Sequence, residues 1–291
     1  MVQRTTYSHG ELCWADVQTP DVAAAKSFYA AVFGWSYEDL PTPDGGSYAQ
    51  AFIDNDLVAV VAPQNPAQQE AGTPAQWNVY FAADDARLVA EEAPHAGGAV
   101  EFGPEEVGDS GVMVFLRPPG GGTTGVWQAG THVGSRRQNE PGAFAWAELL
   151  TPEPRAAVGF FQQLFGHEVT EYPQDDGGTY TTLIAGGAEV AGVAPEPLIG
   201  DEGEDGAAEQ EEAEEGAEEP AGPDSAEARA RQGWQVYFGV SSVKEAVLAA
   251  VAAGAEVLVE PEFAEDGGTI ATLKDPQGGV FSVLEVELPG F

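Results

Sequence analysis

Residues 10–63 read GELCWADVQTPDVAAAKSFYAAVFGWSYEDLPTPDGGSYAQAFIDNDLVAVVAP, and residues 142–195 read GAFAWAELLTPEPRAAVGFFQQLFGHEVTEYPQDDGGTYTTLIAGGAEVAGVAP. The two segments align without a gap at a constant shift of 132 positions, and 20 of the 54 aligned positions are identical. Trp14 aligns with Trp146, and Gly34 aligns with Gly166. The chain therefore contains an internal repeat, and its period is far too long for a solenoid.

The repeat resumes further along the chain at a shift of 157 positions. Residues 77–81 (WNVYF) match residues 234–238 (WQVYF), and the Pro-Gly-rich segment at 119–122 matches 276–279. The second copy is 25 residues longer, and an acidic insertion near 200–229 accounts for the difference. The repeat predicts two tandem domains of one fold, each of about 130 residues and large enough to bury its own core. We place these domains at 8–129 and 142–289, joined by a polar linker at 130–141.

The composition indicates a globular protein without a membrane segment. Hydrophobic residues make up 43% of the chain, yet no apolar run approaches the roughly 20 residues that a membrane span needs. Residues 1–9 are polar and lack the apolar core of a signal peptide, so we expect a cytoplasmic location. The single cysteine, Cys13, excludes an internal disulfide and a cysteine-cluster metal site. Cys13 is either a reactive thiol or a small buried side chain, and its place in a predicted strand favours the second.

The formal net charge of −37 argues against polyanionic partners. So acidic a surface repels phosphate backbones and anionic lipids, so we expect neither a nucleic-acid nor a membrane partner. It suits a cation, a cationic ligand, or simply a very soluble protein. The insertion at 200–229 contains almost only Glu, Asp, Ala, Gly and Pro, and we expect it to be disordered. A solvated loop is the favoured interpretation, and a docking segment for a basic protein partner is the alternative.

Hydrophobic periodicity predicts the same order of elements in each half of a domain. In the first strand, Leu12, Trp14 and Asp16 alternate onto one face. Thr19 then caps a helix that ends at Gly34. For the first domain we predict strands at 8–18, 35–40, 47–53, 57–62, 77–82, 99–102, 111–117 and 123–128, with helices after 19 and at 85–96. Each half is thus a β-α-β-β-β unit.

Paired units of this kind, together with several short motifs, resemble the vicinal oxygen chelate superfamily, which contains glyoxalases, extradiol dioxygenases and bleomycin-resistance proteins. The motifs are Phe28-Tyr29 with Phe33-Gly34 in the first helix, the Asp-Pro-Gln-Gly-Gly turn at 275–279 and its degraded copy at 118–122. The tandem layout looks most like a two-domain actinobacterial glyoxalase-like subgroup. The resemblance implies an α+β fold in which each domain forms an eight-stranded cup. It does not fix the chemistry, because this superfamily hosts lyases, isomerases, oxygenases and non-catalytic drug-binding proteins.

Metal-dependent members that this chain resembles hold one divalent ion in each cup, with ligands on the first strand of each unit and a Glu on the last strand. In this chain, tryptophans stand at four of the six ligand positions. An indole nitrogen is a hydrogen-bond donor and has no lone pair with which to bind a cation. Of the four histidines, His9 is the one near a first strand, and the others are His95, His132 and His167. We therefore predict no bound metal and no cofactor. Carried over residue by residue, the ligand positions fall on Trp14, Trp77 and Gly125 in the first domain and on Trp146, Trp234 and Ser282 in the second.

Matching aromatic and acidic residues predict a binding site in place of the metal. A carboxylate beside aromatic rings can hold a cationic or hydrogen-bonding ligand. If a reaction occurs without metal, Asp16 or Glu148 is the candidate general base, and burial against the indoles would raise its pKa toward the working range. The alternative is a packed cup in which these side chains only fill space. The predicted ligand-binding residues are the paired tryptophans Trp14, Trp77, Trp146 and Trp234, the carboxylates Asp16 and Glu148, and the phenols Tyr48 and Tyr180.

The sequence thus favours a glyoxalase-like protein that binds a small organic molecule, of the sequestration or resistance type, and lacks the superfamily metal site. A divalent-metal-dependent lyase or isomerase of the glyoxalase type is the alternative. A third class is an interaction protein that uses the acidic insertion. Whether the chain is an enzyme stays open at this point.

Overall fold

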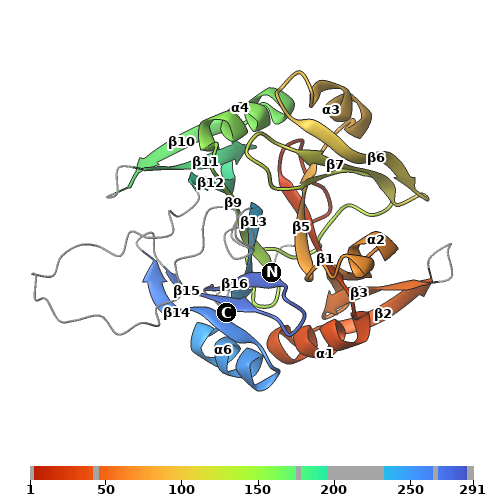
Figure 1. Cartoon of the computed structure of the whole chain (residues 1–291), viewed down its shortest axis with the longest axis vertical. Helices are drawn as coiled ribbons and strands as arrows, with labels where there is room; N and C mark the ends of the chain where they lie inside the picture. Colours follow the sequence, from red (N-terminus) through yellow and green to blue (C-terminus); the bar gives the residue numbers. More distant parts are fainter. Residues whose placement is uncertain (1–2, 42–45, 175–177, 196–232, 265–267, 287–291) are drawn as a thin grey trace, which may run out of the picture.

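The computed structural model describes residues 3–41, 46–174, 178–195, 233–264 and 268–286. It contains two eight-stranded mixed sheets, one from each half of the chain (Figure 1). This confirms the two tandem domains predicted from the repeat and the α+β fold that the resemblance implies. The acidic insertion at 200–229 lies outside the described residues. Among the described residues, every helix falls short of the length and hydrophobicity that a membrane span requires.

The first sheet consists of two four-stranded halves that meet at β1 and β5. Its strand order is β2-β3-β4-β1-β5-β8-β7-β6. β1 runs parallel to β4 and antiparallel to β5, so the first strands of the two units lie side by side at the centre. The strands are β1 (Leu12–Thr19), β2 (Ser36–Pro41), β3 (Ser47–Ile53), β4 (Asp56–Pro63), β5 (Gln76–Ala82), β6 (Ala99–Val107), β7 (Gly111–Arg117) and β8 (Thr124–Ala129).

The second sheet repeats this topology strand for strand. Its order is β10-β11-β12-β9-β13-β16-β15-β14, with β9 parallel to β12 and antiparallel to β13. The strands are β9 (Phe144–Thr151), β10 (Glu168–Pro173), β11 (Thr179–Ala185), β12 (Ala188–Pro195), β13 (Gly233–Val240), β14 (Glu256–Ala264), β15 (Gly268–Lys274) and β16 (Val280–Glu285).

Local sequence fixes the ends of the first helix, α1 (Val22–Phe33). The Asp21 carboxylate accepts a hydrogen bond from the Ala24 N–H at 3.0 Å, which satisfies a free donor of the first turn. The cap is therefore Asp21, and the prediction of Thr19 is wrong by two residues. Gly34 ends the helix at φ 73°, a left-handed conformation that glycine adopts without strain. The short helix α2 (Pro66–Glu70) was not predicted.

Helices from the two domains lie next to one another. α1 packs against α6 (Val243–Ala252), and Figure 1 shows this pair on one side of the molecule. On the other side lie α3 (Ala86–Glu92) and α4 (Pro154–Phe165). The Gly98 backbone, just beyond α3, approaches the Phe160 ring of α4 so closely that a β-carbon would collide with it. Each sheet thus presents its helix-covered side to the other domain.

These helix-covered sides share one apolar core. The Phe238 ring lies 4.8 Å from the Trp77 ring and 4.9 Å from the Phe33 ring, measured between centroids. The Phe81 and Phe161 rings, also from different domains, are 5.3 Å apart. All five side chains belong to a single cluster of buried and partly buried residues that spans both domains. Burial of aromatic surface across this interface stabilises the two domains as one unit.

Two hydrogen bonds across the interface follow the internal repeat. The Trp35 indole N–H donates to the Gly142 carbonyl at 2.7 Å. The His167 Nε2 lies 2.8 Å from the Gly10 carbonyl oxygen. In the repeat, Trp35 aligns with His167 and Gly10 aligns with Gly142. Equivalent residues of the two domains therefore bond the backbone just before the other domain's first strand. This reciprocity indicates that a pseudo-twofold axis relates the two domains.

A buried tyrosine joins α1 to the second domain. The Tyr29 hydroxyl donates to Asp275 Oδ2 at 2.7 Å and accepts from the Trp77 indole N–H at 3.0 Å. Tyr29 and its two partners are almost entirely buried, so water cannot replace either bond. Asp275 also begins the turn that the sequence analysis singled out, and its Oδ1 accepts the backbone N–H groups of Gln277 and Gly279.

We predict that Tyr29→Phe destabilises the protein, because it leaves a buried carboxylate oxygen and a buried indole N–H each without a partner. The expected loss in the free energy of unfolding is about 1–3 kcal/mol. Urea unfolding followed by tryptophan fluorescence measures it. Tyr172→Phe is the matched control, since the Tyr172 hydroxyl bonds Glu189 on the surface and its loss should change little. Equal effects of the two variants would contradict this account.

Candidate functional site

The side of each sheet away from the helices carries a matched pair of polar and aromatic positions, and we call it the cup face. In the antiparallel β1–β5 pairing, Trp14 lies opposite Tyr80, and Asp16 lies opposite Asn78. Directly opposed residues of a pair point to the same face, so these four side chains gather at the centre of the first cup face. In the second sheet, the same register places Trp146 opposite Tyr237 and Glu148 opposite Gln235.

Trp77 and Trp234 lie on the opposite, helix-covered face, which corrects the prediction of two tryptophans in each cup. Trp77 pairs with Val17 in the shared core, and its indole binds Tyr29. The Trp234 indole donates to the Thr124 hydroxyl at 2.9 Å, across the domain interface. A strand alternates faces at every residue, so an assignment shifted by one position inverts the side chain.

The alternation predicted for the first strand also fails at its beginning. The pairing of β1 with β5 is irregular between Leu12 and Trp14, and Cys13 lies between them. As a result Leu12 packs in the shared core, while Cys13 packs with Trp14 at the cup face. The Cys13 thiol is fully buried and desolvation raises its pKa, which fits the structural role favoured from the sequence over a reactive one.

Asp16 is a buried carboxylate at the centre of the first cup face. It is 9% exposed and accepts hydrogen bonds from Asn78 Nδ2 at 2.8 Å and from the Tyr80 hydroxyl at 2.6 Å. Desolvation raises the pKa of Asp16 to about 6, although both hydrogen bonds favour the ionised form. The same contact raises the pKa of Tyr80 further beyond the effect of its own burial. Trp14, at 5% exposure, lies against this group. The first cup centre is therefore closely packed.

Glu148 occupies the equivalent position in the second domain but is half-buried. Its Oε1 accepts from the Tyr180 hydroxyl and its Oε2 from the Tyr237 hydroxyl, both at 2.7 Å. The Trp146 indole N–H in turn lies 3.1 Å from the Tyr180 hydroxyl. Burial, and then the Glu148 charge, raises the pKa of Tyr237, which keeps the phenol protonated as a donor. Trp146, Tyr180 and Tyr237 are also half-buried, so this group reaches solvent.

In the second cup, the structure brings together Trp146, Glu148 and Tyr180, three of the four predicted residues. In the first cup, it brings together Trp14 and Asp16. Tyr48 aligns with Tyr180, but Asp16 takes its hydrogen bonds from Asn78 and Tyr80 instead. Sequence reasoning missed Asn78, Tyr80 and Tyr237. The sequence did carry a signal for the two tyrosines, because Tyr80 and Tyr237 match in the repeat. Each stands three residues after the tryptophan of its strand, so it points to the opposite face of the sheet.

The side chains at the positions of the superfamily metal ligands do not fit a divalent ion. In the first domain, the Tyr80 ring lies directly against Gly125, where any β-carbon would collide with it, so no carboxylate fits at this position. In the second domain, Ser282 bonds Gln235 and Thr272. Across the residues that the structure describes, no three His, Cys, Asp or Glu side chains gather closely enough to hold a metal ion. We therefore derive no step through a metal.

The paired β-α-β-β-β units and their doubled cup faces match known families. Residues 12–124 match the family model described as Glyoxalase/Bleomycin resistance protein/Dioxygenase superfamily, and residues 146–284 match that of the glyoxalase-like domain. The chain belongs to this superfamily. The protein named "Putative glyoxylase CFP32" from Mycobacterium tuberculosis is 36% identical over 98% of both chains. The "Anthracycline biosynthesis protein DnrV" of Streptomyces peucetius is 33% identical, covering 97% of this chain and 95% of that protein.

Solved structures share the fold at low sequence identity. The Mn(II)-bound glyoxalase from Novosphingobium aromaticivorans superposes with a TM-score of 0.61 at 16% identity, over 96% of this chain and 83% of that one. The 2,3-dioxygenase LapB from Pseudomonas sp. KL28 gives 0.61 at 12% identity, over 98% and 96%. The chain therefore shares the tandem fold of these two enzymes.

The raised pKa of Asp16 predicts a pH-dependent stability difference between the native protein and Asp16→Asn. A carboxyl group whose pKa is higher in the folded state than the ordinary value of 3.8 stabilises the fold at low pH, and this contribution is lost as the pH rises through about 6. From about pH 5 to about pH 8, the variant should gain roughly 1–1.5 kcal/mol relative to the native chain. Urea unfolding at both pH values measures this. A difference that stays constant with pH would show that Asp16 titrates normally.

Proposed function

We propose that this protein binds a small organic molecule at the cup face of its second domain, without the superfamily metal. One observation carries the proposal: Glu148 and its two phenol partners form an ordered polar group that is only partly buried, whereas the equivalent Asp16 group is buried. A binding site needs polar groups that are both held in position and accessible.

The chemistry of this group favours a ligand with a protonated amine and a flat aromatic body. Glu148 supplies the negative charge, and the Trp146 and Tyr180 rings beside it supply π-faces that attract cations. A charge-assisted hydrogen bond from an ammonium group to a carboxylate is about twice as strong as a neutral one. The net charge of −37 also raises the local concentration of cations.

The relatives' names support the same ligand class. DnrV and the 31% identical DauV of Streptomyces sp. strain C5 are both named anthracycline biosynthesis proteins, and each match covers 97% of this chain. An anthracycline combines a planar ring system with an amino sugar, which is the chemistry that the Glu148 group suits. We propose a small organic partner of this kind and a cytoplasmic location, with no nucleic-acid or membrane partner.

We predict that Glu148→Gln weakens anthracycline binding about tenfold, because it removes the anionic partner of the ligand amine. Quenching of anthracycline fluorescence in a titration with purified protein measures the dissociation constant. The titration is run at high salt, because a strongly acidic surface binds cations non-specifically at low ionic strength. Asp16→Asn is the matched control: it removes the same charge at the equivalent position of the sealed cup and should leave the dissociation constant unchanged. Equal losses in both variants would assign the effect to net charge and contradict the proposed site.

A divalent-metal-dependent lyase or isomerase of the glyoxalase type is the second candidate, favoured by the name of the 36% identical relative. We predict that protein purified without chelator and washed at high salt retains far less than one transition-metal ion per chain, because neither cup centre offers a sufficient ligand set. Plasma mass spectrometry measures the content. One tightly held zinc, nickel, manganese or iron ion per chain or per domain would overturn the proposal in favour of the enzyme.

A further inference from the structure

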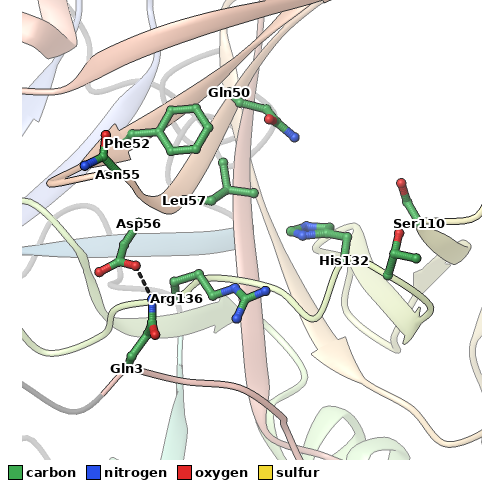
Figure 2. A pocket seen from close by; sticks show the side chains of 10 residues that line it. Gln3, Gln50, Phe52, Asn55, Asp56, Leu57, Ser110, His132 and Arg136 are labelled. Atoms are coloured by element: carbon green, nitrogen blue, oxygen red, sulfur yellow. Dashed lines mark hydrogen bonds between the residues drawn. The ribbon is translucent and has the colours of Figure 1, made fainter.

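A pocket of about 520 Å³ opens on the cup face of the first domain, beside the closely packed Asp16 group. Its volume falls in the range of small-molecule sites. None of the ligand-binding residues predicted from the sequence lines it. The walls come from β3, β4, the turn before β7 and the interdomain linker, and include Gln50, Phe52, Leu57, Ser110, His132 and Arg136 (Figure 2).

The linker wall of this pocket is held rigidly. The Arg136 N–H donates to the Leu57 carbonyl at 2.7 Å, and the Arg136 carbonyl accepts from the Arg4 N–H at 2.9 Å. One residue earlier, the Ser135 N–H donates to the Cys13 carbonyl at 2.8 Å. The Trp127 indole donates to the His132 carbonyl at 2.8 Å. The linker is thus fixed across the beginnings of β1 and β4 as a preformed wall, which lowers the entropic cost of binding.

Two adjacent arginines of the linker have opposite roles. The Arg137 guanidinium lies within 3.8 Å or less of three carboxylates, those of Asp54, Asp56 and Glu140. The Arg136 side chain makes no hydrogen bond or ion pair with any residue in the described part of the chain. Figure 2 shows its guanidinium group between Asp56 and His132. The Arg137 hydrogen bond, and to a smaller extent the Arg136 charge, lower the pKa of Asp56, so the Arg136 guanidinium acts on this carboxylate without forming an ion pair with it. In a chain with 11 basic and 48 acidic residues, such a guanidinium has N–H groups available for a ligand.

His132 provides a neutral polar group on the same wall. Its ring packs edge-on against Trp14 at 4.5 Å and against Trp127 at 5.4 Å, between centroids. Burial, and then the nearby Arg136 charge, lowers the pKa of His132 to about 4. The imidazole is therefore uncharged at neutral pH and can donate one hydrogen bond while adding no charge of its own.

From this geometry we infer that the pocket is a second binding site, selective for a small organic carboxylate. The carboxylate pairs with the Arg136 guanidinium, whose fork matches both oxygens, and the apolar body lies against Phe52 and Leu57. Gln50 and Ser110 supply further hydrogen-bonding groups at the rim. This site is independent of the proposed Glu148 site and opposite to it in ligand charge.

The acidic surface does not prevent such binding. Interactions between exposed charges are screened beyond about 8 Å at physiological ionic strength, whereas the guanidinium acts at contact distance. The nearest carboxylate, Asp56, is already paired with Arg137 and Gln3. The net charge of −37 therefore opposes highly charged anions more than a monocarboxylate.

We predict that 2-naphthoate binds the full-length protein saturably, whereas the isosteric neutral amide 2-naphthamide binds at least about tenfold more weakly. Isothermal titration calorimetry measures both constants. Arg136→Gln should weaken naphthoate binding about tenfold or more and remove the preference over the amide. Arg87→Gln is the matched control, since it removes the same charge from an exposed position outside the pocket and should change neither constant.

A second measurement covers the case in which Arg136→Gln does not fold. The imidazole NMR signals of His132 in the unmodified protein should shift on naphthoate addition, while those of His95 stay fixed. Equal dissociation constants for 2-naphthoate and 2-naphthamide would overturn the inference. Naphthoate binding that leaves the His132 signals unshifted would overturn it as well. Anthracycline binding should persist in Arg136→Gln, so failure of this site and failure of the Glu148 site are distinguishable.

Discussion

The burial of both helix-covered sheet faces in one apolar core constrains the rest of this structure. Phe33 and Trp77 of the first domain meet Phe238 of the second, and Phe81 meets Phe161. Because each sheet turns its helices toward the other domain, the two cup faces are left on opposite sides of this core. The cup faces are therefore two separate surfaces, and Tyr29, Trp35 and His167 bond across the interface between the domains.

The two cups have the same arrangement of a carboxylate and its hydrogen-bond donors, but the two carboxylates differ in their exposure to solvent. Both place a carboxylate opposite a strand partner of the neighbouring unit, and in both a tyrosine hydroxyl donates to it. In the first domain Asn78 completes the group and burial seals it, so desolvation dominates its titration. In the second domain a more distant tyrosine, Tyr180, takes that place and the group stays half-exposed.

The linker between the domains has become part of a site. Ser135 and Arg136 bond the beginnings of β1 and β4, residues 130–132 bond the turn before β7, and these contacts place His132 and Arg136 beside the first cup. Because the linker forms one wall of the pocket in the first domain, it brings the positive charge of Arg136 to that domain's cup face. The contrast between Arg136 and Arg137 follows from which carboxylates each can reach.

The sequence by itself determined the repeat, the order of elements and the superfamily, because these depend on spacing and periodicity that survive in a linear chain. It also placed Asp16, Glu148 and Tyr180 at the cup centres. The tertiary structure alone decided the face of Trp77 and Trp234, since one residue inverts a strand and only packing between domains selects the register. It alone also decided which carboxylate is sealed, and it revealed the Arg136 pocket, because burial and long-range contacts between linker and sheet are not encoded in local pattern.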